Sequence, residues 1–200
     1  LPKFKIDMDK KNLLLWGEQG VGDQILFLRF LKNIKPYVNN LFIKIDKRLH
    51  PLINRFCSGI IFFDKDVNLN LDAQLPLGDL PSLFVKDNSY FLNNKNYYLS
   101  SDPKIKKKLE VNIKSKNKFL CGISWISNTD EIGSNKSITL DTLEPILKSE
   151  NVEFVDLQYT ETLTERENFY NKNKIKIKKI ETIDNFNDLN GLISLIDVCD

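Results

Sequence analysis

Histidine and cysteine are scarce in this chain of 200 residues. His50 is the only histidine, and the three cysteines, Cys57, Cys121 and Cys199, are widely separated in the sequence. Because there is no Cys-x-x-Cys pair and no Cys/His spacing typical of zinc ligands, the sequence predicts neither a disulfide framework nor a metal site. A single histidine also leaves no Ser/His/Asp or Cys/His set for nucleophilic catalysis. An odd number of dispersed cysteines favours a reducing, cytoplasmic setting.

Long apolar runs and an excess of one charge are also missing. No run approaches the roughly 20 apolar residues that a membrane-spanning helix needs, and no secretory signal pattern is visible, so we expect no transmembrane segment. Lys plus Arg number 29 and Asp plus Glu number 27, which gives a formal net charge of +2. A balance so close to neutral argues against a general nucleic-acid partner. The 42% of hydrophobic residues is enough to build a core.

Short apolar runs alternate with amphipathic segments in the first half of the chain. We expect strands at residues 13–16, 41–45, 60–63 and 71–75, with helices between them from about 22 to 35 and from 48 to 56. This β-α-β-α-β alternation favours a parallel sheet. Residues 86–102 lack long apolar periodicity, and Asp102-Pro103 then has the pattern of a helix start. We therefore predict a first domain at residues 1–101 and a second at 102–200.

The second half repeats the alternation without repeating the sequence. We expect strands at residues 119–125, 153–157 and 175–180, and helices at 103–114, 141–148, 162–171 and 187–196; residues 141–144 resemble a capping box. The fold class is therefore α/β with two Rossmann-like parallel-sheet domains. Ligands of such sheets bind beyond the carboxyl ends of the strands. The loops that follow Trp16, Trp125 and Tyr159 are thus the candidate site loops.

The most distinctive stretch is WGEQGVGDQ at residues 16–24. Gly20 and Gly22 match the first two glycines of a dinucleotide fingerprint, and Asp46 lies at about the right distance for a ribose contact, but Ile25 replaces the third glycine. Asp23 would also place a negative charge where the pyrophosphate should lie. A carboxylate at a helix start is either a general base or a charge that stabilises the helix N-terminus by about 0.3–1 kcal/mol.

Two further stretches follow strands of the second half. Hydroxyls and amides gather between Ser124 and Ser137, together with Lys136, which is suited to binding phosphate as a point charge. An ordinary polar loop is the other interpretation. Gln158-Tyr159 closes a strand and could contact a base or a sugar, or could simply cap the sheet.

These stretches, in this order, resemble the glycosyltransferase-like domains that follow tetratricopeptide repeats in many bacterial proteins, relatives of the lipopolysaccharide heptosyltransferases. The matching stretches are residues 16–23, 27–30, 50–52, 122–125, 136–138 followed by Leu143, 157–159, and the helix that closes at Asp200. They span nearly the whole chain.

The resemblance implies a GT-B architecture, in which the second domain holds most of a nucleotide-sugar donor. It implies that Asp23 is the base that activates the acceptor, with Gln19, Gly20 and Gly22 forming the turn on the acceptor side. It implies that Lys136 binds donor phosphate and that Ser124 and Gln158 lie near the donor. No metal and no cofactor are required, and the acceptor (protein, lipid or glycan) is left open.

Family members continue past the position of Asp200 and carry tetratricopeptide repeats upstream. We therefore expect the second domain to be truncated at its C-terminus here, tetratricopeptide repeats to be present in the full-length protein, and this fragment to be inactive alone. The alternative is a non-catalytic binding or scaffold domain of a repeat protein.

Overall fold

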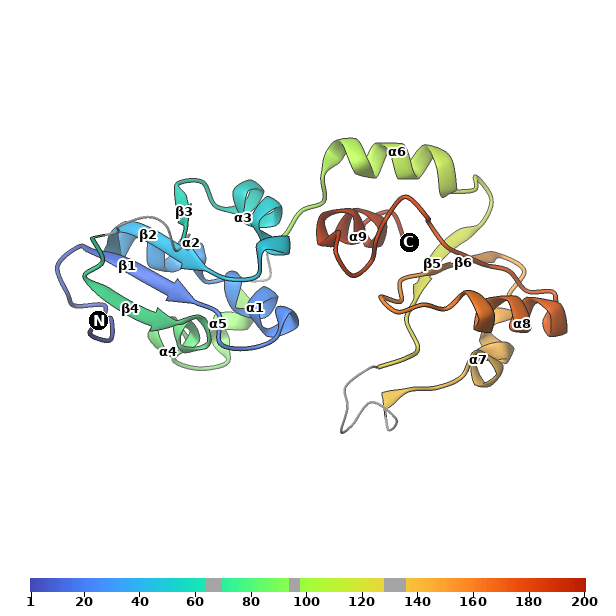
Figure 1. Ribbon diagram of the computed structural model, residues 1–200, viewed down its shortest axis with the longest axis horizontal. Helices are drawn as coiled ribbons and strands as arrows, with labels where there is room; N and C mark the ends of the chain where they lie inside the picture. Colours follow the sequence, from blue (N-terminus) through green and yellow to red (C-terminus); the bar gives the residue numbers. More distant parts are fainter. Residues whose placement is uncertain (64–69, 94–97, 128–135) are drawn as a thin grey trace. The chain divides into compact units, whose positions relative to one another are not determined.

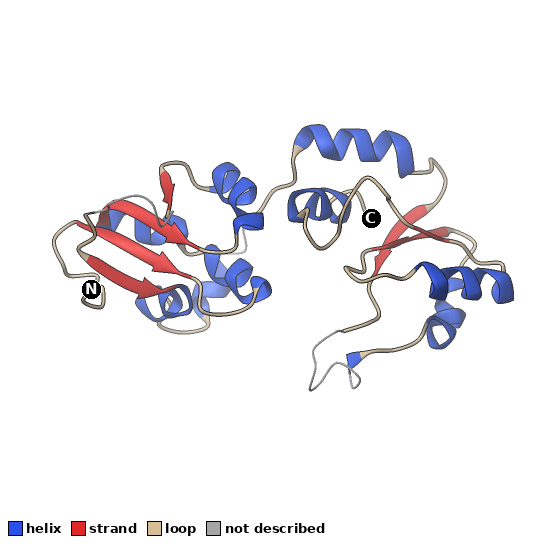
Figure 2. Cartoon of the chain, in the orientation of Figure 1, coloured by secondary structure: helices blue, strands red, loops and turns tan. Residues whose placement is uncertain are grey.

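The computed structural model describes residues 1–63, 70–93, 98–127 and 136–200, and the chain divides into two compact units, Leu1–Ser100 and Ser101–Asp200 (Figure 1). Each unit contains a parallel sheet with helices packed against it (Figure 2). The predicted α/β class and the parallel strands are confirmed, and the arrangement is consistent with Rossmann-like domains. Within the described ranges, none of the helices has the length and apolarity needed to span a bilayer.

The first unit has a four-stranded sheet in the order β3-β2-β1-β4. The strands are β1 (Lys11–Trp16), β2 (Val38–Lys44), β3 (Ile60–Phe62) and β4 (Ala73–Pro76). Leu13 and Leu15 of β1 and Ile43 of β2 are completely inaccessible to solvent, whereas Ile61 of the edge strand β3 is 41% exposed. Continuous apolar runs of this kind are typical of parallel strands, which are covered on both faces.

The helices of the first unit are short. They are α1 (Val21–Leu28), α2 (Leu31–Ile34), α3 (His50–Phe56), α4 (Leu80–Phe84) and α5 (Ser89–Asn93), with 3-10 turns at Lys35–Tyr37, Lys47–Leu49 and Leu77–Asp79. The single helix expected from about residue 22 to 35 is wrong, because the chain breaks between α1 and α2. The break leaves Phe30 buried, with its ring stacked on Phe84 and Tyr90 at centroid distances of 6.4 and 5.6 Å.

The second unit has three strands in the order β5-β6-β7. They are β5 (Phe119–Ile123), β6 (Val152–Asp156) and β7 (Ile177–Lys178), and the helices are α6 (Pro103–Ile113), α7 (Leu140–Leu147), α8 (Leu163–Asn173) and α9 (Leu189–Ile196). Leu120 and Val155 pack in a core cluster with residues of α6 and α9, whereas Phe154 packs in another with residues of α7 and α8. Successive side chains of a strand point to opposite faces. Two helices therefore cover each face of this sheet.

The cap of α6 agrees with the sequence prediction, whereas the cap of α7 differs from it. Asp102 caps α6 as predicted, by accepting hydrogen bonds from the main-chain N–H groups of Lys104 and Ile105. The capping box expected at Asp141 is wrong. Thr139 caps α7 instead, accepting from Thr142 N at 3.2 Å, and Asp141 lies in the first turn.

Replacing Asp102 with alanine removes this cap, and we expect the second unit to lose about 1 kcal/mol of unfolding free energy. Urea denaturation of the 200-residue chain measures the change. Asp102→Asn keeps a capping oxygen and is the matched control, which should retain most of the stability. Equal losses in both variants would contradict the capping role.

Candidate functional site

The glycine turn lies at the carboxyl end of β1 and leads directly into α1. Gly20 is the N-cap of α1 and forms no side-chain cap. A Cβ atom added at Gly22 would meet nothing within 4 Å, and one at Gly20 would meet only the Asp23 carboxylate, 3.7 Å away. The turn is therefore open on the side of these two glycines, where a ligand can approach the main chain.

Gln24 fastens this turn to the end of β2. Its side chain is buried, its Nε2 donates to the carbonyl of Gln19 at 2.8 Å, and its Oε1 accepts from Asp46 N at 3.0 Å. A Cβ atom added at Gly17 would lie 2.7 Å from Gln24 Cδ, so this glycine is needed for the close approach. The sequence did not reveal this role.

Glu18 makes a second connection, from the glycine turn to the 3-10 turn after β4. Its Oε1 accepts from Gly78 N at 3.1 Å, and a Cβ atom added at Gly78 would lie 2.5 Å from that oxygen. Two of the polar side chains of residues 16–24 thus serve to hold three strand ends together. The side chain of Gln19 is exposed.

Asp23 is different, because its carboxylate is exposed in the first turn of α1. Among the described residues, no basic side chain pairs with it. Close by in the chain, the indole N–H of Trp16 is buried and has no hydrogen-bond partner within the same described ranges. A buried donor without a partner is rare in folded proteins, and this one lies at the end of β1, directly before the glycine turn.

Asp46, the ribose ligand of the dinucleotide interpretation, is already engaged. Its carboxylate accepts from Arg48 N, Nε and Nη2, at 3.0, 2.9 and 2.6 Å. These hydrogen bonds from Arg48 hold the pKa of Asp46 below its usual value. His50 is likewise occupied, since its ring stacks on Phe62 at 3.8 Å and burial lowers its pKa.

In the second unit, Gln158 connects the loop after β5 to the end of β6. Its side chain is fully buried, and its Oε1 accepts from Ser124 Oγ, Trp125 N and Ile126 N at 2.9, 3.1 and 3.2 Å. Its Nε2 donates to the carbonyl of Ile126 at 2.6 Å. Gln158 therefore shapes the loop from inside, and Ser124 lies exposed on its surface.

Lys136 is exposed just before Ser137, whose hydroxyl accepts from Ser127 N at 2.9 Å. This hydrogen bond joins the two described ends of the polar loop. The part of the candidate loop at residues 128–135 lies outside the described residues.

A buried ionic cluster centred on Asp156 supports the same edge of the sheet. The carboxylate has no exposure to solvent and accepts from Gln158 N and from the Thr162 hydroxyl. It also pairs with Arg166 at 3.2 Å and with Lys179 at 3.6 Å. The sequence prediction missed this cluster, although a charged residue inside the apolar run EFVDL was a usable signal.

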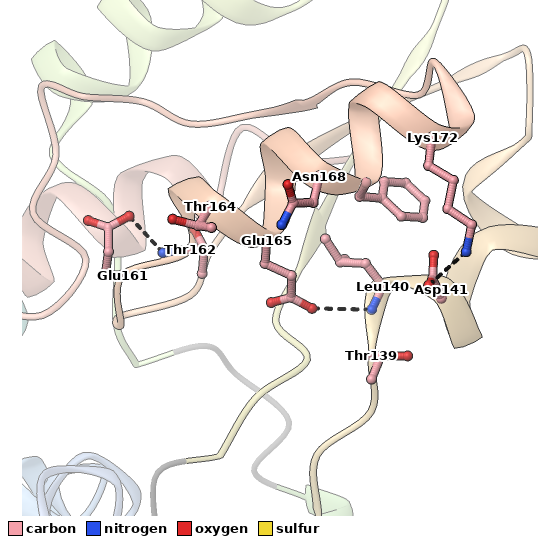
Figure 3. A pocket seen from close by; sticks show the side chains of 10 residues that line it. Thr139, Leu140, Asp141, Glu161, Thr162, Thr164, Glu165, Asn168 and Lys172 are labelled. Atoms are coloured by element: carbon pink, nitrogen blue, oxygen red, sulfur yellow. Dashed lines mark hydrogen bonds and ion pairs between the residues drawn. The ribbon is translucent and has the colours of Figure 1, made fainter.

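A hollow of about 470 Å³ lies between the amino end of α7 and one side of α8, where it is lined from Thr164 to Lys172 (Figure 3). Glu165 reaches across it, accepting from the indole Nε1 of Trp125 at 2.9 Å and from Leu140 N at 3.4 Å. The lining is rich in carboxylates and hydroxyls and contains Thr139, Asp141, Glu161, Thr162, Thr164, Glu165, Asn168 and Lys172. Such groups suit the hydroxyls of a sugar or a ribose better than they suit a phosphate.

No group of three or more His, Cys, Asp or Glu side chains within the described ranges is arranged to hold a metal ion. Comparison of the chain with protein-family models, with curated proteins and with solved structures finds no match.

The Asp156 cluster gives a clear prediction for stability. Asp156→Asn leaves Arg166 and Lys179 without their buried counter-charge, and we expect a loss of about 3–5 kcal/mol of unfolding free energy. The control is Asp141→Asn, which breaks an exposed pair with Lys172 and should cost less than about 1 kcal/mol. Urea denaturation compares the two, and equal small losses would show that the cluster is not a stabilising centre.

Proposed function

We propose that this chain is a GT-B-type glycosyltransferase region that transfers a sugar from a nucleotide-sugar donor to a hydroxyl acceptor. The observation that carries the proposal is the contrast around the glycine turn. Structural hydrogen bonds engage the side chains of Glu18, Gln24 and Asp46. Asp23, in contrast, remains exposed beside an open main chain. A carboxylate left in this state is suited to take a proton from an acceptor hydroxyl.

The transfer needs two kinds of assistance. Asp23 accepts the acceptor's proton while the acceptor oxygen bonds to the anomeric carbon of the donor sugar. The bond from that carbon to the diphosphate oxygen breaks, and the nucleoside diphosphate leaves. Lys136, exposed on the loop after β5, stabilises the negative charge that develops on this leaving group.

The second unit supports donor binding at the carboxyl edge of its sheet. Ser124 offers an exposed hydroxyl there, and the hollow around Glu165 offers acceptors for ribose or sugar hydroxyls. We assign Gln158 the role of holding the loop in place, because its side chain is buried and bonded to that loop. In the full-length protein we place this region beside tetratricopeptide repeats in the cytoplasm.

A dinucleotide-dependent reaction is less well supported. The carboxylate that would hold the ribose, Asp46, is engaged by Arg48, and Asp23 lies at the turn where a pyrophosphate would need positive surroundings.

Asp23→Asn in the full-length protein should lower the transfer rate at least about a hundredfold, because the amide cannot accept the proton. Release of nucleoside diphosphate from a panel of nucleotide sugars measures the rate. Asp9→Asn changes an equally charged, exposed residue of the same unit and should leave the rate unaltered. An unchanged rate in Asp23→Asn would overturn the base assignment.

Lys136→Ala should raise the donor KM about tenfold or more, through loss of a charge-assisted contact with phosphate. Lys116→Ala, which removes another exposed lysine of the second unit, is the control. If the donor KM and kcat of Lys136→Ala match those of the wild type, the phosphate role is wrong. If the wild-type full-length protein binds no nucleoside diphosphate and no nucleotide sugar, the non-catalytic scaffold interpretation replaces the proposal.

A further inference from the structure

We infer that the outer side of α6 docks on the negatively charged surface of a lipid bilayer. The residues that form this basic face are exposed, and they are Lys104, Lys107, Lys108 and Val111. The inference goes beyond the proposed function and does not depend on it.

The two sides of α6 differ in their contacts. Leu109 is buried in a core cluster that includes residues of α9, and Ile105 and Ile113 pack against the same cluster (Figure 1). Because each residue of an α-helix is turned by about 100° from the one before, the residues of the basic face come together on the opposite side. Val111 lies among them and is 78% exposed. Since the buried side fixes α6 to the core, the basic face is formed before any partner binds.

Positive charge is concentrated in α6 and the turn after it. Residues 103–118 contain seven lysines and one glutamate, a net charge of +6 in a chain whose total is +2, so the remaining residues together carry −4. Lys106, which lies off the basic face, pairs with Asp197 at 2.9 Å. Within the described ranges, no carboxylate forms an ion pair with the three lysines of the basic face.

The lysines of the basic face do not stabilise the helix on which they lie. α6 has no acidic residue in its first turn, and Lys104 places a positive charge there, at the positive end of the helix dipole. Lys104 and Lys108 are also four positions apart, a spacing at which like charges on a helix repel each other. Contact with a negatively charged partner relieves this repulsion.

The type of side chain favours a membrane surface as that partner. Lysine carries a compact charge on a flexible stem, whereas bidentate contacts with fixed anions need arginine, which α6 lacks. Mobile lipid headgroups can adapt to such charges, and roughly four to eight basic residues on one amphipathic helix are typical of binding to anionic lipids. The aliphatic side chain of Val111 can enter the boundary between headgroups and acyl chains. A nucleic acid would leave this side chain without a role.

Vesicle sedimentation of the full-length protein tests the inference by measuring the ratio of bound to free protein. The vesicles contain phosphatidylcholine and phosphatidylglycerol at about two to one, or phosphatidylcholine alone. Each lysine near an anionic surface raises binding roughly fivefold, so the triple variant Lys104→Gln, Lys107→Gln, Lys108→Gln should bind the mixed vesicles about a hundredfold more weakly than the wild type. The wild type should prefer the mixed vesicles to the neutral ones by a similar factor.

The control variant Lys5→Gln, Lys10→Gln, Lys86→Gln removes the same charge from exposed positions of the first unit. It should change binding less than about threefold at physiological salt, because charges away from the contact are screened. Urea denaturation should show that the α6 variant is at least as stable as the wild type, since glutamine forms helix as well as lysine does and the repulsion is gone. Weaker binding then cannot come from unfolding.

Val111→Ser keeps every charge and should weaken binding to the mixed vesicles about three- to tenfold. Unchanged binding of this variant would contradict the entry of the side chain into the bilayer. The inference is overturned if the wild type binds both kinds of vesicle equally, or if the two triple variants weaken binding equally. It is also overturned if the α6 variant loses binding to a single-stranded DNA oligonucleotide while its vesicle binding is unchanged. None of these outcomes bears on sugar transfer, which is measured separately by release of nucleoside diphosphate.

Discussion

The buried amide of Gln158 joins the ends of β5 and β6, and the carboxyl edge of the second unit depends on it. One oxygen accepts three hydrogen bonds from the loop after β5, while the main chain of Gln158 is held by Asp156, Lys179 and Asn185. Gln24 does similar work in the first unit, between the glycine turn and the end of β2. In both units a buried glutamine therefore fixes the loops where a parallel sheet binds its ligands.

The polar side chains near the strand ends fall into two groups: those that bond inward and support the loops, and those that stay exposed. In the first unit Glu18 and Gln24 are bonded inward, and Asp23 remains at the surface. In the second unit Gln158 and Asp156 are bonded inward, and Lys136 remains at the surface. Burying a polar group is favourable only when its hydrogen bonds are satisfied. The buried hydrogen bonds made by the first group therefore fix the loops on which the exposed side chains lie.

The strands could be predicted from sequence because continuous apolar runs are a local signal, as at residues 60–63, where β3 spans Ile60–Phe62. The break after α1 could not, because it depends on the packing of Phe30 against rings more than 50 positions away. The cap of α7 was misplaced because Thr139 and Asp141 both have capping chemistry, and only the main-chain geometry selects Thr139. For Gln158, the sequence could indicate a strand end but not that the side chain turns inward.

Hydrogen–deuterium exchange of the full-length protein, with and without a nucleoside diphosphate, tests most directly whether the carboxyl edge of the second unit binds a nucleotide. We expect slower exchange at residues 124–127 and 158–162, with no change at residues 116–119 and 149–152 at the opposite edge of the same sheet. Exchange that is unchanged everywhere, or slowed only at the opposite edge, would contradict it.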